Sequence, residues 1–470
     1  MDFLFNFLIQ SGLDTSSPWS VLWWLFTHGG FIFIVWVILK GLSALWLNWR
    51  QGIYASKVKW IYLAIDVPRD NEQSPKAVEQ IFNHLWGSIK GANLIEKWWD
   101  GYFQQNFSLE LVSIEGYIQY IIRTQAVFRD LVEAAIYAQY PEAQITEIED
   151  YTQEFTPDNF KEKGYNLWGA QFGLVKDEIY PIKTYPLFEH PISKTIVDPM
   201  AAILEVFSRM GKGEQAWLQI VIKPVADDWK EKSEKEVKKI VGVKTETKKS
   251  AIDKLMDAPS GIATKIGDVV FGPAAESGKK EEKLEVPSKM LYLSPGERET
   301  VEAIDRKATK TGFKTKIRYI YLAKKEVFSK PKGVSGLVGA LRQFTLLNAN
   351  GFKPVKGTVT KADYFRVEQR VYRLQRKILK NYKSRSSWAG GDKEGFILNT
   401  EELASIYHFP SKGIVAPTLK TIEAKRSEAP FELPVESEEV EEMPLAGGAS
   451  EKVEASHAKK KAAPPENLPI

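Results

Sequence analysis

The sequence predicts an α+β protein that is attached to a membrane by one N-terminal transmembrane helix. Three observations lead to this prediction: a long apolar stretch near the N-terminus, two successive runs of alternating strand and helix patterns, and charged low-complexity segments within and after them. The predicted parts are a short segment 1–18, a transmembrane helix 19–47, a first α/β domain 57–155, a second α/β domain 165–350 with a disordered insertion 229–290, a long basic helix with an extended C-terminal segment 358–434, and a disordered tail 435–470.

The composition of the 470 residues limits the class of protein. There are 64 Lys and Arg residues against 60 Asp and Glu, and the resulting formal net charge of +4 is unlike that of a dedicated nucleic-acid-binding protein. The chain contains no cysteine, which excludes disulfides, thiolate metal sites and cysteine nucleophiles. About 410 residues follow the apolar stretch, enough for two or three domains of ordinary size.

The apolar stretch runs from Trp19 to Leu39, and its apolar character continues to Leu47. A membrane-crossing helix needs ~20 mostly apolar residues, which this stretch supplies. A cleaved signal peptide is the alternative, but it has a basic start and an apolar core of only ~7–15 residues. Here acidic residues precede a longer core, so we predict a permanent single-pass anchor. Tryptophans near both ends fit the aromatic belts of such helices, namely Trp19, Trp23, Trp24, Trp46 and Trp49.

The charges that flank the stretch predict its orientation. Lys40, Arg50, Lys57 and Lys59 follow it, whereas no Lys or Arg precedes it. Positively charged flanks remain in the cytoplasm. We therefore expect a protein of the inner (cytoplasmic) membrane with its N-terminus outside and the remaining chain in the cytoplasm. His28 lies inside the predicted span, where a neutral imidazole bonded to a neighbour or to water is favoured over a proton-sensitive site.

The first α/β domain begins with a strand and a helix. Val58–Val67 is rich in β-forming residues, and Ser74 followed by Pro75 is typical of a helix start. Next, alternating apolar residues on both sides of Glu115 and Gly116 predict a hairpin. Thr124 is predicted to cap a second helix, and residues 144–151 supply a last strand. The resulting order is the β-α-β-β-α-β of a ferredoxin-like unit. Because its helices cover one face of the sheet, we expect the other face to be free for a partner.

The second α/β domain has a similar order, interrupted by the insertion. Its predicted elements are a strand at 179–188, a helix at 198–210, a strand at 216–223, a helix at 294–310 with a capping box from Ser294 to Glu297, a strand at 314–323 and a helix at 334–344. The insertion is rich in Lys, Glu, Ser and Gly, which predicts disorder. An apolar patch within it, 262–271, fits a short amphipathic helix that either touches the membrane surface or packs locally. The order of elements alone leaves open whether the two domains are duplicates.

A long helix is predicted at 362–382. Apolar residues spaced by three and four form one stripe along it, namely Tyr364, Val367, Val371, Leu374 and Ile378. Cations cover much of its remaining surface and are the candidate contacts for nucleic acid or a partner: Arg366, Arg370, Arg373, Arg376, Lys377 and Lys380. The favoured interpretation is a helix that buries its stripe and exposes its charges to solvent. Binding to DNA phosphates or anionic lipid, and packing against a partner helix, are the alternatives.

The motifs of common enzymes are missing from the sequence. There is no G-x-x-x-x-G-K-[ST] loop, and the glycines around Lys212 fit a helix end better than a phosphate site. The five histidines include no H-E-x-x-H pair, which argues against a histidine zinc site. Two carboxylates brought together by folding remain an alternative. We predict that the protein is not an enzyme and has no catalytic residues, cofactor or metal.

Nine stretches of this sequence together resemble an uncharacterised domain family of ultrasmall, reduced-genome bacteria. They are Phe107–Gly116, Tyr120–Thr124, Arg129–Glu133, Ile136–Glu142, Glu147–Thr152, Asp198–Ala202, Gly213–Ile220, Leu398–Ala404 and Tyr407–Pro410. The resemblance covers roughly residues 57–434 without the insertion. Proteins of this family look like membrane-proximal partners of conjugation and type IV secretion ATPases of the HerA/FtsK/TraG class, and often precede such an ATPase on one chain.

The resemblance implies a function but no catalytic residues, since the family has none established. This sequence continues into the predicted disordered tail where the fused ATPase would begin, so we expect either that the motor is a separate protein or that this copy acts without one. The predicted function is a non-enzymatic, membrane-anchored scaffold of a conjugation or type IV secretion-like machine that docks a P-loop motor. The alternative is a membrane-tethered nucleic-acid-binding module that uses the helix 362–382. The expected partners are the inner membrane and the motor ATPase, and a second copy of the chain and DNA are further candidate partners.

Overall fold

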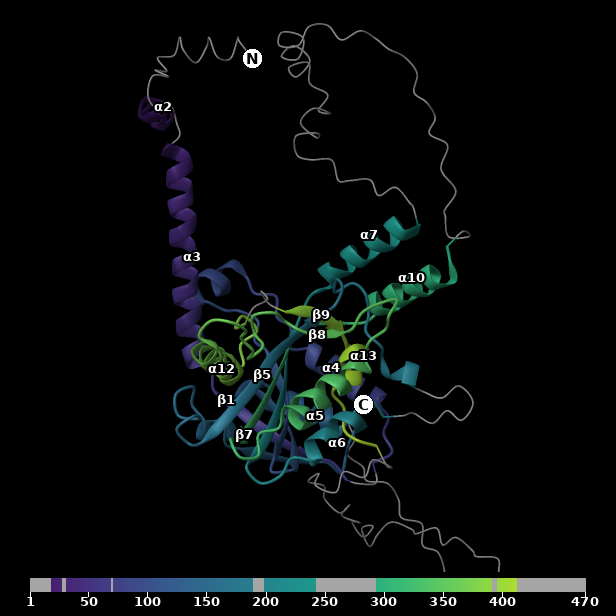
Figure 1. Ribbon diagram of the computed structural model, residues 1–470. Helices are drawn as coiled ribbons and strands as arrows, with labels where there is room; N and C mark the ends of the chain where they lie inside the picture. The colour runs from purple at the N-terminus through teal and green to yellow at the C-terminus, as the bar shows by residue number, and fades with distance from the viewer. Residues whose placement is uncertain are drawn as a thin grey trace, which may run out of the picture. The chain divides into compact units, whose positions relative to one another are not determined.

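The computed structural model describes residues 18–27, 31–68, 71–188, 198–241, 293–390 and 395–411. These residues form a mixed α+β fold around one large antiparallel sheet (Figure 1). Its strands follow the order β4-β1-β3-β2-β6-β7-β5-β8, and β9 pairs with β7 beside this path. The strands are β1 Trp60–Asp66, β2 Phe107–Ile114, β3 Tyr117–Gln125, β4 Gln144–Ile148, β5 Tyr165–Leu174, β6 Glu214–Pro224, β7 Gly312–Lys324, β8 Phe352–Pro354 and β9 Phe396–Asn399.

Two helices precede the sheet, α2 at Pro18–Leu25 and α3 at Phe31–Lys57. The predicted transmembrane span 19–47 overlaps both helices, α3 continues beyond it to Lys57, and which residues lie in lipid stays a prediction. The apolar run indicates only the part suited to lipid, whereas residues 48–57 contain no proline that would end the helix. α3 is long and apolar enough to cross a membrane, and none of its residues is buried. His28 lies outside the described residues.

The first half of the sheet has the predicted order of elements. The helix α4, Pro75–Trp86, follows β1, and α5, Arg129–Tyr137, connects β3 to β4. All neighbours in the order β4-β1-β3-β2 are antiparallel. The predicted helix cap at Thr124 is wrong, since this residue lies in β3 opposite Ile61 and is fully buried. A β-branched side chain suits a strand, and the helix begins only after a short 3-10 turn at Ala126–Phe128.

The second half repeats the connections of the first. The helix α6, Ala201–Ser208, connects β5 to β6, and α11, Gly336–Arg342, connects β7 to β8. The neighbours β8-β5-β7-β6 are again antiparallel and follow the same order as β4-β1-β3-β2. The strand predicted at 179–188 is wrong: this segment ends in a 3-10 turn at Tyr185–Phe188, and β5 lies before it. Two prolines in the segment lack the N–H that a central strand needs.

The two halves share one sheet because β2 pairs with β6. The antiparallel register runs from Phe107 opposite Ile222 to Ile114 opposite Gln215. The second strand of each half thus lies at the seam, and the sheet continues across it. The two predicted domains are therefore joined by a strand pairing that extends along the whole of β2.

The ends of the insertion are more ordered than predicted. Trp229 is buried, and a helix, α7, follows it at Lys230–Val241. This helix packs beside α10, Pro295–Ala308 (Figure 1). The predicted disorder is therefore wrong for residues 229–241. Residues 242–292, including the predicted amphipathic patch 262–271, lie outside the described residues. The capping box that starts α10 is confirmed, because Ser294 and Glu297 bond each other's backbone N–H groups.

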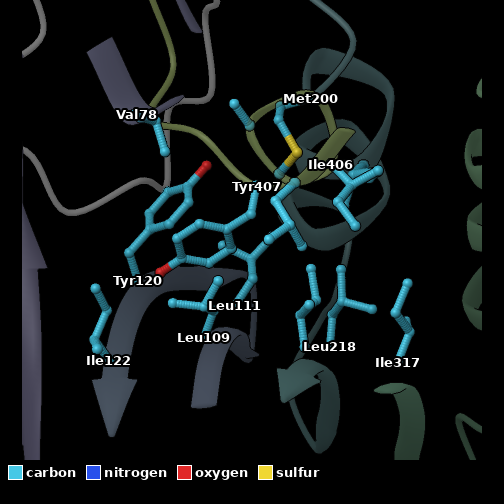
Figure 2. Close-up of a cluster of buried hydrophobic side chains, with 14 of the residues drawn as sticks. Val78, Leu109, Leu111, Tyr120, Ile122, Met200, Leu218, Ile317, Ile406 and Tyr407 are labelled. Carbon is cyan, nitrogen blue, oxygen red and sulfur yellow. The ribbon is translucent and has the colours of Figure 1, made fainter. Parts of the chain in front are cut away.

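The main hydrophobic core lies between one face of the sheet and the helices α4, α5, α6, α11 and α13, the last at Thr400–Ile406. Figure 2 shows Tyr120 from β3 and Tyr407 after α13 lying against each other, with ring centroids 5.5 Å apart. The C-terminal part of the described chain therefore completes the core of the first half. The sequence predicted only an extended segment here, and this is wrong for α13. The predicted tail 435–470 lies outside the described residues.

The other face of the sheet is covered in its middle by α12, Val367–Ser384 (Figure 1). Ile378, Leu379 and Tyr382 pack there against Trp217 of β6. A Cβ atom at Gly169 of β5 would lie only 3.0 Å from the Ile378 side chain, so this glycine lets the helix approach closely. The predicted free face is therefore wrong here. The sheet face and the basic helix were both expected to be available to a partner, but the helix covers this part of the sheet face.

Candidate functional site

The six predicted cations all lie on or next to α12 and are exposed. Arg366 precedes the helix in a left-handed conformation, with φ 49°. The predicted start at 362 is therefore wrong, and the helix begins at Val367. Tyr364 is 94% exposed and does not belong to the buried stripe. The helix instead buries Gln375, Ile378, Leu379 and Tyr382.

Five of the six cations follow one helical spacing. Arg366, Arg370, Arg373, Lys377 and Lys380 are separated alternately by four and three residues, which aligns the four from Arg370 to Lys380 along one side of α12, and Arg366 lies just before its first residue. We call this set the basic stripe. It lies opposite the buried face, and at 1.5 Å per residue its helical part from Arg370 to Lys380 is about 15 Å long. The sixth cation, Arg376, lies beside the stripe and forms an ion pair with Asp158.

Polar contacts fix α12 on the sheet at both ends of its buried face. Gln375 donates to the carbonyl of Leu167 at 2.6 Å. Lys383 donates to the carbonyls of Thr152 and Phe155 at 2.6 and 2.7 Å. The helix that carries the basic stripe is therefore held in a defined position. This favours binding of a charged partner, because the helix backbone need not become ordered when the partner binds.

A buried ion network lies where α12 ends. Arg385, in a left-handed conformation with φ 48°, forms ion pairs with Glu110 of β2 at 2.9 Å and Asp150 at 2.8 Å. Tyr151 donates to Glu110 at 2.8 Å. Burial alone would raise the pKa of Glu110, but the Arg385 charge and these hydrogen bonds outweigh it and lower the pKa. The same arginine lowers the pKa of Asp150 to about 2 against the effect of burial.

A second buried arginine, Arg318 of β7, holds the chain that follows α12. It donates to Gln219 at 2.9 Å and to the carbonyls of Ser386 and Ala389 at 2.6 Å each. Burial lowers the pKa of Arg318 to about 10, so it remains charged at neutral pH. Gln219 in turn donates to Glu110 at 3.0 Å, directly across the seam between the halves. The network therefore connects α12 to both halves of the sheet.

Sequence reasoning missed this network. One signal was present, because Glu110 is the one charged residue of the strand Phe107–Ile114 and a carboxylate that becomes buried requires a partner. Its partner Arg385 lies 275 residues later, just beyond the predicted helix end, and nothing in the local pattern marks it.

Two of the stretches that carry the family resemblance, Asp198–Ala202 and Tyr407–Pro410, meet in a second cluster. His408 contacts Asp198 at 2.8 Å through Nε2 and the carbonyl of Ala404 at 2.7 Å through Nδ1. Both ring nitrogens thus lie within hydrogen-bond distance of an oxygen atom. Burial alone would raise the pKa of Asp198. The interaction with His408 and hydrogen bonds from backbone N–H groups outweigh this effect, so the pKa is lowered. This pair fastens the C-terminal segment to α6.

The described residues offer no group of three or more His, Cys, Asp or Glu side chains that could hold a metal. One hollow of about 830 Å³ opens between β5, β8 and the start of β9. Its charged lining consists of Lys176, Asp177, Glu178, Lys353 and Lys356. Lys353 and Lys176 already donate to nearby backbone carbonyls at 3.2 and 3.0 Å. The basic stripe is thus the clearest candidate binding surface in the described part of the chain.

Comparison with known proteins gives one family match. A family model described as a domain of unknown function, DUF8128, matches residues 82–421. The match covers most of the sheet, α12 and the C-terminal segment that completes the core, but not α3. No curated protein matches the chain.

Proposed function

We propose that this chain, which belongs to the DUF8128 domain family, is a non-enzymatic, membrane-anchored scaffold subunit of a conjugation or type IV secretion-like machine. In this proposal α3 crosses the inner membrane, the sheet and its helices lie in the cytoplasm, and the basic stripe docks a separate P-loop motor ATPase of the HerA/FtsK/TraG class. The observation that carries it is the combination of a long apolar helix that has no buried residue with a rigidly held row of exposed cations on one chain.

The anchor is supported by the surface of α3. Its first residues, from Phe31 to Leu39, are all large and apolar and all exposed, which is costly in water and favourable in lipid. Cations follow in the C-terminal part of the same helix at Arg50 and Lys57, which supports the orientation with the N-terminus outside.

The scaffold role is supported by the repeated architecture. Both halves have four antiparallel strands in the same order with helices on the same face, and we propose that each is a ferredoxin-like unit. The buried Arg385 and Arg318 networks fasten α12 across both units. A binding surface held by two joined units keeps its geometry under load, which suits a protein that positions a motor at a membrane.

The proposal can be tested by site-specific photocrosslinking in intact cells, followed by purification of the full-length chain and mass spectrometry. A photoreactive amino acid at Arg373, in the basic stripe, should capture a P-loop ATPase. The same amino acid at Lys235 on α7 is the control, because this cation is exposed but lies outside the stripe. Absence of an ATPase at Arg373, or equal capture from both positions, contradicts motor docking at the stripe.

A charge-reversal experiment gives an independent test. The triple change Arg370→Glu, Arg373→Glu and Lys377→Glu should lower recovery of the ATPase at least tenfold. The matched control is Lys232→Glu, Lys235→Glu and Lys239→Glu on α7, which has the same spacing of three and four residues and should leave recovery unchanged. An equal loss in both variants would show that overall charge, rather than the stripe, determines binding.

Nucleic-acid binding is the second candidate function, favoured by the alignment of five exposed cations. It predicts that the dissociation constant for duplex DNA rises steeply with salt, because bound phosphates release counterions. The stripe triple variant should then reduce the slope by about 2–3 units, whereas the α7 triple variant should not. A flat response to salt would remove this alternative and leave the motor as the expected partner.

A further inference from the structure

A short segment before β2, which includes a π-helical turn at Glu96–Asp100, packs against the C-terminal part of α3. Residues 93–103, which we call the aromatic loop, contain the sequence Asn-Leu-Ile-Glu-Lys-Trp-Trp-Asp-Gly-Tyr-Phe. Asn93 and Glu96 bond each other's backbone N–H groups at 3.0 and 2.8 Å, and Lys90 pairs with Glu96 at 2.6 Å. These local bonds give the loop a defined shape although its apolar side chains are not buried.

The loop is attached to α3 through its own backbone. Trp46 of α3 donates to the carbonyl of Trp98 at 2.9 Å, and Arg50 donates to the carbonyl of Trp99. The rings of Trp46 and Trp99 lie 5.8 Å apart. Gly101 makes this contact possible: its φ is 73°, and a Cβ atom there would lie 2.4 Å from the Arg50 backbone. The loop is therefore seated directly against the helix.

The attachment turns large apolar side chains outward. Leu94 is 77% exposed, Ile95 70% and Trp99 65%, unlike the buried apolar residues of the neighbouring strands. Trp98 also closes a groove of about 720 Å³ on the surface of α3. The groove is otherwise lined by Leu39, Leu42, Ser43, Leu45, Trp46 and Trp49. An apolar surface thus continues without a break from the candidate span onto the loop.

We infer that the aromatic loop is a second membrane contact, in which Leu94, Ile95 and Trp99 enter the lipid interface and a lipid acyl chain occupies the groove beside Trp98. The inference rests on the proposed anchor, because the groove lies on the part of α3 that would be in the bilayer, where lipid is the solvent. Tryptophan prefers the headgroup region, and a cation adjoins a tryptophan on each of the two segments, with Arg50 after Trp49 and Lys97 before Trp98, where anionic headgroups would meet them. The loop then fixes the tilt of the cytoplasmic units on the membrane.

The absence of cysteine allows a direct test on the full-length chain. Single cysteines at Ile38, Ile95 and Leu347 carry an NBD fluorophore, and the protein is reconstituted in phosphatidylcholine–phosphatidylglycerol vesicles with nitroxide-labelled acyl chains. Position 38 reports on the anchor, position 95 on the loop, and position 347 on an even more exposed apolar residue of the second half. Quenching at 38 and at 95, but not at 347, is the expected result.

The other outcomes separate the two proposals. Quenching at 38 without quenching at 95 overturns the loop contact and leaves the anchor intact. No quenching at 38 overturns both. Equal quenching at 95 and 347 shows unspecific adhesion to lipid and overturns the loop contact.

Two glycine variants test the attachment itself. Gly101→Ala should displace the loop from α3 and reduce quenching at position 95 at least twofold while leaving position 38 unchanged. Gly91→Ala is the matched control, because a Cβ atom there meets nothing within 4 Å. A loop that stays quenched in Gly101→Ala would show that its position does not depend on the close contact with Arg50.

Discussion

At the scale of single residues, Arg385 has the largest structural role that the described contacts reveal. It lies just after α12, is almost fully buried, and pairs with two carboxylates from different parts of the first half. Two forked N–H groups bond Asp150 at 2.8 and 2.9 Å, a geometry that lysine cannot reproduce. Its loss would leave Glu110 buried without a compensating charge.

We expect Arg385→Gln to lower the free energy of unfolding by about 3–5 kcal/mol, because removal of one partner leaves a buried charge unpaired. Urea denaturation of the detergent-solubilised full-length chain, followed by tryptophan fluorescence, measures the change. Arg342→Gln on the exposed face of α11 is the control and should change stability by less than about 0.5 kcal/mol. Similar small effects of both variants would show that the network contributes little.

The same carboxylates predict how stability depends on pH. The pKa of Asp150 is lowered to about 2, and those of Glu110 and Asp198 are also below their usual values. In the unfolded chain these groups titrate near about 4, so the unfolded state binds more protons below that pH. Stability should therefore be constant from about pH 6 to pH 5 and fall as the pH is lowered from about 4 towards 2. Urea midpoints measured across this range check the sign, and a midpoint that rises on acidification would contradict it.

At the scale of elements, the distance between α12 and the sheet depends on Gly169. A methyl group there would meet Ile378 at 3.0 Å, and the carbonyl of Tyr319 lies 3.2 Å away on the other side. The helix that carries the basic stripe can therefore not keep its present position if this residue becomes larger.

We expect Gly169→Ala to lower the free energy of unfolding by about 1–3 kcal/mol through overpacking. Gly339→Ala on α11 is the matched control, since a Cβ atom there meets nothing within 4 Å and alanine favours a helix by about 0.5–1 kcal/mol. Opposite shifts of the two urea midpoints are the expected result. A neutral Gly169→Ala would show that α12 moves without cost.

The elements also show what local sequence patterns can predict. The hairpin of β2 and β3 and the helix α10 were predicted closely, because alternation and a capping box are local signals. The strand β5 was missed and Thr124 was misread as a helix cap. In both cases the structure depends on burial within the sheet, which the local sequence pattern does not show. The six candidate cations were predicted as exposed on a helix, and five of them lie on α12, whereas the left-handed conformation of Arg366 places this residue before the helix.

At the scale of the whole molecule, the seam between β2 and β6 makes the two halves one structure. Eight consecutive residue pairs connect them, and the C-terminal segment of the second half packs into the core of the first. No local pattern indicates this pairing, because the complete sheet determines which strands pair when they lie far apart in the chain. The family resemblance pointed to the residues of the core and the seam without revealing their contacts.

We therefore expect both halves to unfold in one transition. Leu109→Ala in the first half and Ile317→Ala in the second each remove a buried side chain and should lower stability by about 2–5 kcal/mol. Either change should shift the whole urea transition, observed by circular dichroism and fluorescence together. Two separate transitions, with only one moved by each variant, would show that the halves are independent domains.

The position of Phe409 has a consequence for synthesis of the protein. Its ring packs against Tyr120 and Tyr140, with centroids 5.1 Å apart in both cases. Ribosomes add roughly 5–20 residues each second, so the roughly 290 residues between Tyr120 and Phe409 take about 15–60 seconds to appear. During that time the first half is already synthesised, but the part of its core that Phe409 covers remains exposed to solvent. Nascent chains of this protein should therefore be prominent clients of ribosome-associated chaperones until translation passes the Tyr-His-Phe-Pro motif.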